Sequence, residues 1–151
     1  MHTPLRVQEV KIDDSIKKSW AISGTPGDCI KLGIFAVLDE KPDLIISGIN
    51  HGPNLGTDIL YSGTVSAAME GAVLGFPSIA ISLADLGTYC YDFTYAADFI
   101  SKFIPKMLEV RYPAKTILNI NIPAINKEKI TGIAITKIGT RMYLSLIHIS
   151  Q

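Results

Sequence analysis

Short apolar segments that alternate with segments of helical periodicity constrain this fold more than any other feature. Residues 43–48 (DLIISG) and 78–83 (SIAISL) lack the polar alternation of half-exposed strands. Such runs are typical of strands that are buried on both faces of a parallel sheet. Two more strands are predicted at 116–123 (TILNINIP) and 130–139 (ITGIAITKIG). Because helical segments lie between the first three strands, the order predicts an α/β fold with a mostly parallel sheet.

The first predicted helix lies within residues 23–43. One helical stripe of this segment carries the apolar side chains of Ile30, Ile34, Val37 and Leu38. Asp28 is suited to the N-cap position, because a short acidic side chain accepts a hydrogen bond from the first turn. Pro42 lacks a backbone N–H, so we expect it to end this helix.

Two further helices are predicted at 62–75 and 91–110. In the first of these, one face is formed by Val65, Met69 and Val73. Gly75 and Pro77 follow it and mark its end. Pro105 lies inside the longer helix and predicts a kink there.

The N-terminal part of the chain predicts a small hairpin. Residues 4–12 alternate apolar and polar side chains, and residues 19–23 form a second short strand. Asp13 and Asp14 are an adjacent carboxylate pair between these strands. They are either cation ligands or ordinary turn residues, and a turn is the preferred interpretation because acidic residues are common there.

Composition excludes several classes of protein. The 151 residues suit one domain, and 14 basic residues balance 14 acidic ones. Neutral charge offers no attraction to nucleic acid or to an anionic membrane. No apolar run reaches the roughly 18 to 20 residues of a membrane span, and the start lacks a signal-peptide pattern. Cys29 and Cys90 have no metal or redox spacing, so we expect packing roles in a reduced, cytoplasmic protein.

The long connection between the strand at 43–48 and the helix at 62–75 is the candidate site. In open α/β sheets, ligands bind beyond the carboxyl ends of the strands. This connection is rich in residues that permit tight turns or offer amide groups, namely Gly48, Gly52, Gly56, Gly63, Asn50 and Asn54. Loops of roughly fifteen residues in compact domains are usually functional.

The start of the following helix has the features of a phosphate site. Its first backbone N–H groups have no partner within the helix and lie at the positive end of the helix dipole. Ser62 and Thr64 add hydroxyl groups, and Gly63 permits close approach to the backbone. Asn50 and Asn54 could offer an oxygen to a cation or an N–H to a phosphate. The alternative is structural: Ser and Thr commonly cap helices, and Gly and Asn commonly serve turns.

Three other side chains near this loop have open interpretations. His51 is either a general acid or a solvated surface residue, and the second interpretation is preferred. Asp58 either contacts a metal ion or caps a turn, and the turn is preferred. Glu70 lies two turns into the helix and either pairs with a cation or faces solvent.

The segment DLIISGINHGPNLGTDILYSGTVSAAMEG, residues 43–71, closely resembles the signature of the SurE family, the survival-protein-E nucleotidases. The segments PLRV, GTPGDCI and EKPDL precede it in the family's order. FPSIAISL, NINIPA and ITKIGTRMY follow it, so the resemblance covers residues 3–143.

This resemblance implies a metal-dependent phosphatase that acts on nucleoside 5′- and 3′-monophosphates. It implies a Rossmann-like, three-layer α/β sandwich with a C-terminal β extension that is used in dimers and tetramers. The matching positions make Asn50 a ligand of a divalent metal ion, Mg²⁺ or Mn²⁺. They place the phosphate on Asn54, Ser62, Gly63 and Thr64. A water activated by the metal ion would attack the polarised phosphoryl group.

The chain also departs from the family pattern at both ends. Members of the family begin with a strand that ends in an acidic, metal-binding pair, followed by a further serine ligand. Neither feature is present before residue 4, and Asp13 and Asp14 do not match that pair. Residues 144–151 do not fit the family and suggest a non-native tail. We therefore expect residues 1–151 to form one partial domain, truncated at both ends and inactive by itself.

Two alternatives to an enzyme fragment remain at this point. The first is a non-catalytic module that binds nucleotides or phosphate through the same helix end. The second is a scaffold that serves only interactions, which the composition of the loop disfavours.

Overall fold

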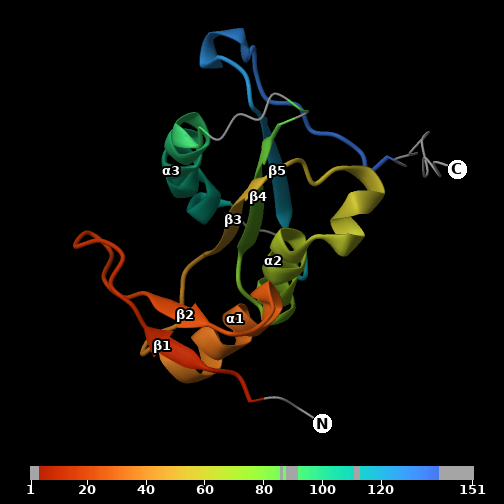
Figure 1. The fold of residues 1–151 in the computed structure, drawn as a ribbon. Coiled ribbons are helices and arrows are strands. Elements are labelled where there is room, and N and C mark those ends of the chain that lie inside the picture. Colours follow the sequence, from red (N-terminus) through yellow and green to blue (C-terminus); the bar gives the residue numbers. More distant parts are fainter. Residues whose placement is uncertain (1–3, 86, 88–91, 111–112, 140–151) are drawn as a thin grey trace, which may run out of the picture.

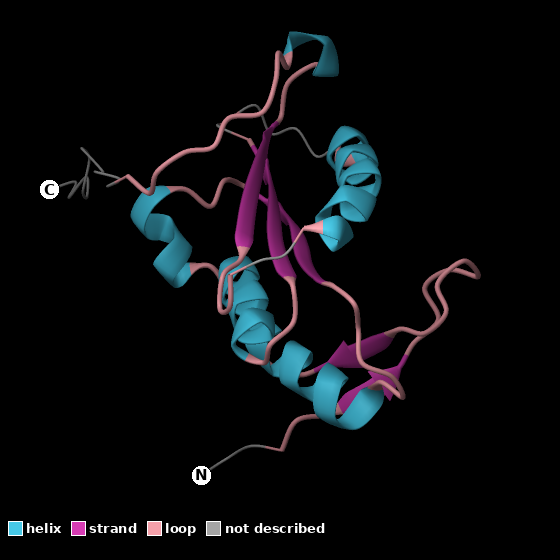
Figure 2. Cartoon of the chain, turned by 180° about the vertical axis from the view of Figure 1, so that it is seen from behind, coloured by secondary structure: helices cyan, strands magenta, loops and turns pink. Residues whose placement is uncertain are grey.

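The computed structural model has three layers, a parallel sheet between two helices (Figures 1 and 2). The structure describes residues 4–85, 87, 92–110 and 113–139. The sheet has the order β3-β4-β5, and its strands are β3 (Ile45–His51), β4 (Ser78–Ala84) and β5 (Leu118–Pro123). All neighbouring strands run parallel, with Ile45 opposite Ser78 and Ile79 opposite Leu118. The predicted α/β class and the three-layer arrangement are confirmed.

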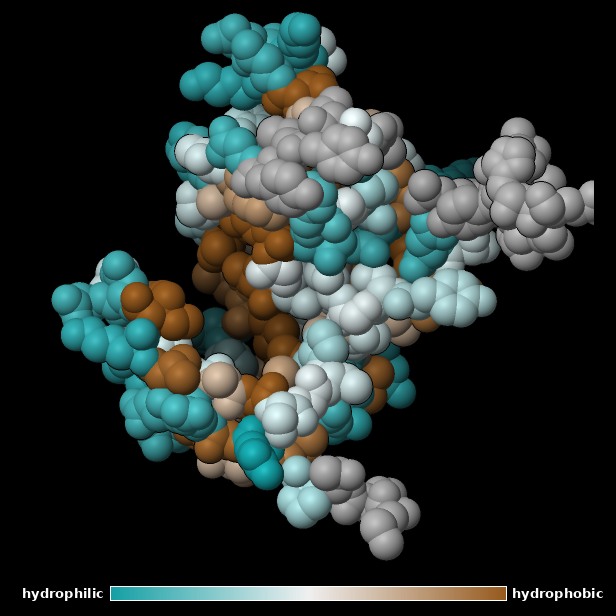
Figure 3. Space-filling view, viewed as in Figure 1, coloured by the Kyte–Doolittle hydropathy of each residue, from teal (hydrophilic) through white to brown (hydrophobic). Residues whose placement is uncertain are grey.

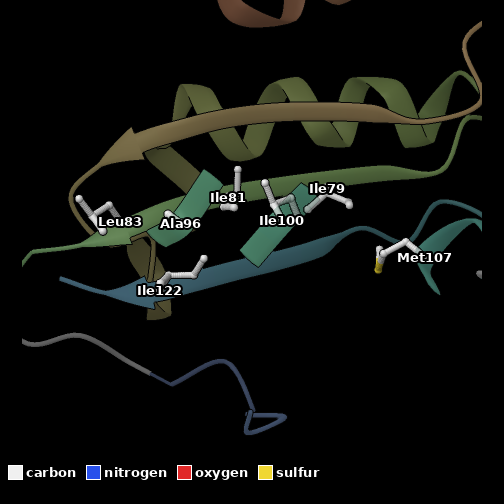
Figure 4. Close-up of a cluster of buried hydrophobic side chains, with 7 residues drawn as sticks. All are labelled: Ile79, Ile81, Leu83, Ala96, Ile100, Met107 and Ile122. Atoms are coloured by element: carbon white, nitrogen blue, oxygen red, sulfur yellow. The ribbon is translucent and has the colours of Figure 1, made fainter. Parts of the chain in front are cut away.

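Strand β4 is the centre of the core, as its apolar sequence predicted. Six of its seven residues are buried. On one face, Ile79, Ile81 and Leu83 pack against α3 (Thr94–Glu109), together with Ile122 of β5 (Figure 4). On the other face, Ala80 packs against α2 (Gly63–Val73). Helix α3 continues through Pro105, so the predicted helix at 91–110 is confirmed over residues 94–109.

Strand β3 is less buried than its sequence predicted. Only Ile45 is buried, and 39% of the surface of Ile46 is exposed. The prediction of burial on both faces is wrong because β3 is an edge strand of the sheet that the structure describes. Apolar surface is correspondingly visible in a hollow between the N-terminal hairpin and α3 (Figure 3).

The N-terminal hairpin is confirmed, although its strands are short. Strand β1 (Val7–Glu9) pairs antiparallel with β2 (Trp20–Ile22), and all three residues of β1 are exposed. Between the strands, Asp13 accepts hydrogen bonds from the backbone N–H and the hydroxyl of Ser15, at 2.8 and 2.5 Å. These bonds lower the pKa of Asp13. Asp14 pairs with Lys11 at 2.5 Å, so both carboxylates serve this turn.

The first helix begins and ends at other residues than predicted. Helix α1 (Pro26–Leu32) continues as a π-helical segment, η1 (Gly33–Val37), which stops well before Pro42. Its N-cap is Thr25, and not Asp28. Asp28 lies at the third position and completes a capping box, in which its carboxylate accepts from the Thr25 N–H at 2.9 Å.

Helix α2 buries a different face from the predicted one. Val65 is buried, but Met69 is 52% and Val73 is 60% exposed. The buried face consists mainly of small residues, namely Val65, Ala67, Ala68, Gly71 and Ala72. Gly71 shows the reason, because an added Cβ there would lie 2.5 Å from Ser78 Oγ and 2.7 Å from Ile45 Cδ1. The helix lies too close to the sheet for large side chains.

The predicted strand at 130–139 is wrong. These residues form no strand, and Ile133, Ile135 and Ile138 are 73%, 101% and 75% exposed. Apolar and polar residues alternate in this segment as they do in a strand, but no strand in the part of the chain that the structure describes pairs with it. None of the described helices combines the length and the apolar character needed to span a membrane. The predicted tail at 144–151 and Cys90 lie outside the described residues.

Candidate functional site

A bulge in β3 determines where the side chain of Asn50 lies. Ser47 pairs with Ala80 and Asn50 pairs with Ser82, so β3 has one extra residue between them. Without this residue, Asn50 would lie opposite Leu83, whose side chain faces α3. The bulge places Asn50 on the α2 side of the sheet instead. Gly48 permits this path, since its φ is +118° and an added Cβ would lie 2.3 Å from the Ile81 carbonyl oxygen.

The structure brings Asn50 and Thr64 together, as the sequence predicted. The hydroxyl of Thr64, in the first turn of α2, donates to Oδ1 of Asn50 at 3.3 Å. The amide nitrogen of Asn50 donates to the carbonyl of Gly52 at 2.9 Å and to that of His51 at 3.2 Å. These two bonds orient the amide so that its oxygen points toward the start of α2.

Ser62 and Gly63 form the beginning of α2. Ser62 is the N-cap, and its Oγ accepts from the N–H of Val65 at 3.1 Å. An added Cβ on Gly63 would lie 3.1 Å from Cγ of Pro26, so the glycine lets α2 start against α1. The capping role is therefore present. It uses the N–H of Val65 and leaves the hydroxyl hydrogen of Ser62 and the N–H groups of Gly63 and Thr64 as donors.

Asn54 is buried, unlike an ordinary loop residue. Only 6% of its surface is exposed, and its Nδ2 donates to Oγ of Ser82 at 2.7 Å. Its backbone is bound by Asn119 and Asn121 of β5. These two asparagines were not among the residues predicted for the site. Their signal was the pattern Asn-x-Asn in an otherwise apolar strand, which places two amides on one face.

His51 is an exposed residue, as the preferred interpretation predicted, but its imidazole also has partners. Its Nε2 lies 3.4 Å from Oδ2 of Asp85, whose side chain is only 3% exposed. The ring of Phe93 lies edge-on to the imidazole, with the centroids 6.3 Å apart. His51 thus belongs to a half-buried polar contact at the carboxyl ends of β3 and β4.

The remaining candidates have structural roles. Glu70 pairs with Lys31 of α1 at 3.4 Å, as one of its two interpretations predicted. Asp58 lies in the first turn of the 3₁₀ helix η2 (Gly56–Tyr61), which fits a turn residue. Cys29 is half-buried and has a free thiol.

The described residues do not by themselves fit a divalent metal ion. Among them, no three His, Cys, Asp or Glu side chains cluster as cation ligands. The two groups that meet here are the neutral amide oxygen of Asn50, which accepts, and the Thr64 hydroxyl, which donates to it. Mg²⁺ and related ions require about six oxygen ligands, usually including carboxylates. The donors fit an anion better, because they combine N–H and O–H groups with a helix N-terminus.

These features define a Rossmann-like α/β protein with a polar loop and a helix N-terminus at the carboxyl ends of its parallel strands. Comparison with known proteins identifies the family. The model of the family described as Survival protein SurE matches residues 1–145, and the chain belongs to this family. The resemblance in the segment at 43–71 is thereby confirmed.

Curated relatives and a solved structure support the same assignment. The 5'-nucleotidase SurE of Moorella thermoacetica is 50% identical over 147 residues, covering 97% of this chain and 56% of the relative. That of Carboxydothermus hydrogenoformans is 47% identical, covering 97% and 55%. The crystal structure of the Sure protein from Aquifex aeolicus has a TM-score of 0.80 at 44% identity, and the match covers 95% of this chain and 56% of that one. The chain spans about half the length of the curated relatives that it matches.

Proposed function

We propose that this chain is part of a metal-dependent phosphohydrolase that removes phosphate from nucleoside 5′-monophosphates, and also from 3′-monophosphates. The observation that carries the proposal is the contact of Asn50 with Thr64 at the N-terminus of an 11-residue helix. The names of the curated relatives, 5'-nucleotidase SurE, support the activity and the substrate class.

In this proposal the substrate phosphate binds at the start of α2. Ser62 donates a hydroxyl hydrogen bond to its oxygens, and Thr64 does so once its hydroxyl turns away from Oδ1 of Asn50. The backbone N–H groups of Gly63 and Thr64 donate as well, whereas that of Val65 is bound by the Ser62 cap. Asn54 adds one amide N–H, because Ser82 accepts only one of the two hydrogens on Nδ2. The helix dipole favours the negative charge that develops on the phosphoryl oxygens during transfer.

The proposed metal ion, Mg²⁺ or Mn²⁺, would have Asn50 as one ligand. The described residues lack the carboxylates that such an ion requires, so we route no catalytic step through it. For the same reason we propose that the 151-residue chain alone has little or no phosphatase activity. We further propose a cytoplasmic protein that forms a homodimer or homotetramer in its complete form and binds neither nucleic acid nor membrane.

A second candidate is a non-catalytic module that binds nucleotides or phosphate. The neutral, donor-rich site favours it, since such a site binds a phosphate without any metal ion.

Calorimetric titration with adenosine 5′-monophosphate, with and without Mn²⁺, tests the phosphate site. We expect Thr64→Val to weaken binding about tenfold, through loss of a hydrogen bond to a charged group. Thr94→Val is the matched control, because Thr94 lies in the first turn of α3, remote from this loop in sequence. Equal affinities of the wild type and Thr64→Val would refute the phosphate site.

Release of inorganic phosphate from the same substrate with Mn²⁺ separates the two candidates. Binding without turnover fits the chain as an incomplete enzyme and the non-catalytic module alike. Metal-independent affinity then favours the module, whereas affinity that rises with Mn²⁺ favours the enzyme. Rapid turnover that Asn50→Ala abolishes would refute the proposed inactivity of this chain.

A further inference from the structure

The loop that follows β3 is bound to β5 by side chains. The backbone N–H of Asn54 donates to Oδ1 of Asn121 at 2.8 Å. The Asn54 carbonyl accepts from Nδ2 of Asn121 at 3.1 Å and from Nδ2 of Asn119 at 2.8 Å. Asn54 lies beyond the end of β3, so no neighbouring strand supplies these bonds.

Asparagine is chemically suited to this task. A carboxamide carries a donor and an acceptor side by side, as a peptide group does. Asn121 uses both with the N–H and the carbonyl of one residue, and thereby replaces a peptide of a neighbouring strand. Because Asn54 is only 6% exposed, water cannot readily satisfy its backbone if these side chains are lost.

The bound loop reaches the candidate site through Gly52. The N–H of Gly52 donates to the carbonyl of Leu83 at 2.9 Å, so the loop is attached to β4 as well as to β5. The carbonyl of Gly52 accepts from the amide of Asn50 at 2.9 Å. A shift of the loop would therefore release the Asn50 amide, whose oxygen contacts Thr64.

We propose that Asn119 and Asn121 are positioning residues of the phosphate site, an inference that rests on the proposed function. They hold the backbone of Asn54, so that its amide, Asn50 and the start of α2 keep the arrangement that receives the phosphate. Neither asparagine contacts the phosphate itself. A purely stabilising role would instead lower the stability of the whole fold and leave the affinity for phosphate unchanged.

Amide hydrogen exchange and titration with inorganic phosphate, both followed by NMR on the full 151-residue chain, test this proposal. We expect Asn121→Ala to speed exchange of the Asn54 N–H at least tenfold and to weaken phosphate binding about tenfold, because a buried pair of hydrogen bonds is lost. Asn121→Asp keeps the acceptor, but it replaces the donor with a carboxylate oxygen that faces the Asn54 carbonyl, and it adds a negative charge. It should therefore weaken phosphate binding at least as much as Asn121→Ala does.

Two further variants keep the test decisive. Ile122→Val is the matched control: Ile122 is the next residue of β5, and its side chain packs in the core against α3. It should lower the melting temperature without changing phosphate affinity. Asn119→Ala removes a single hydrogen bond at an exposed position. It takes the place of Asn121→Ala in both measurements if that variant does not fold.

The outcomes separate this inference from the proposed function. Wild-type exchange at Asn54 and wild-type phosphate affinity in the asparagine variants would overturn the inference, as would affinity losses no greater than that of Ile122→Val. If the wild-type chain shows no phosphate-induced shifts at residues 62–64, the proposed phosphate site is refuted instead. The attachment of the loop is then judged by exchange at Asn54 alone, and unchanged exchange in Asn121→Ala refutes it.

Discussion

Replacing Gly48 with alanine should destabilise the protein far more than the same change at Gly52. Both glycines have positive φ, +118° and +102°, where an alanine costs about 1–2 kcal/mol. At Gly52 an added Cβ meets nothing within 4 Å. At Gly48 it would lie 2.3 Å from the carbonyl oxygen of Ile81, roughly 1 Å inside ordinary contact distance.

The additional loss of stability at Gly48 arises because the added Cβ would overlap a backbone atom. The Ile81 carbonyl belongs to the backbone of the buried central strand, so it cannot turn away as a side chain would. Overpacking of this kind costs about 1–3 kcal/mol, which brings the total to about 2–5 kcal/mol. That is a large share of the roughly 5–15 kcal/mol that stabilises a typical domain.

Urea denaturation followed by circular dichroism measures both variants. We expect Gly52→Ala to lose about 1–2 kcal/mol and Gly48→Ala at least about 1 kcal/mol more, with unchanged denaturant slopes. Gly48→Ala should also disturb the NMR signals of Asn50 and Thr64, because the bulge sets the face on which Asn50 lies. Equal losses in the two variants would refute the close contact between β3 and β4 and the bulge that depends on it.

Two further predictions concern the helices. Gly71→Ala should destabilise the protein by about 1 kcal/mol, because overpacking against the sheet exceeds the gain in helix propensity. Gly33→Ala should instead stabilise it by about 0.5–1 kcal/mol, because an added Cβ there meets nothing within 4 Å. Thermal melts that rank the two variants in the opposite order would contradict the packing of α2. The hydrogen bonds from Thr25 lower the pKa of Asp28 below its ordinary 3.8, so the stability that they add is present above that pH and is lost as the pH falls through the lowered value. Thr25→Val should reduce this acid dependence and weaken the cap, and parallel pH profiles of unfolding for variant and wild type would contradict it.

Most secondary elements were predictable because they depend on local pattern. The apolar run of β4 and the helical period of α3 identify both elements without knowledge of their neighbours. The faces of β3 and α2 were mispredicted because burial depends on what packs beside them. Met69 and Val73 have the periodicity of a buried stripe, yet α2 lies so close to the sheet that its alanines and Gly71 face inward. Periodicity locates a helix, but the distance to its neighbour selects the buried face.

The site was predictable only where its residues are close in sequence. Asn50 and Thr64 belong to one strand-to-helix connection, so their meeting follows from the α/β topology. The bonds of Asn54 to Asn119 and Asn121 join residues 65 and 67 positions apart. Nothing local indicates that pairing. The pattern Asn-x-Asn shows that β5 presents two amides on one face, but only the sheet order places that face beside the loop.

The chemistry of the described site is that of binding more than of bond cleavage. Its donors are the first N–H groups of α2, the hydroxyls of Ser62 and Thr64, and the amide of Asn54, while Asn50 presents an amide oxygen. None of these groups carries a charge. Such groups bind a phosphate and stabilise added negative charge on it. They do not deprotonate a water molecule, and they do not hold a divalent cation without carboxylates. Rapid hydrolysis would therefore require anionic ligands in addition to these neutral groups, whereas the phosphate binding that we propose would require only that Asn119 and Asn121 hold the neutral groups in position.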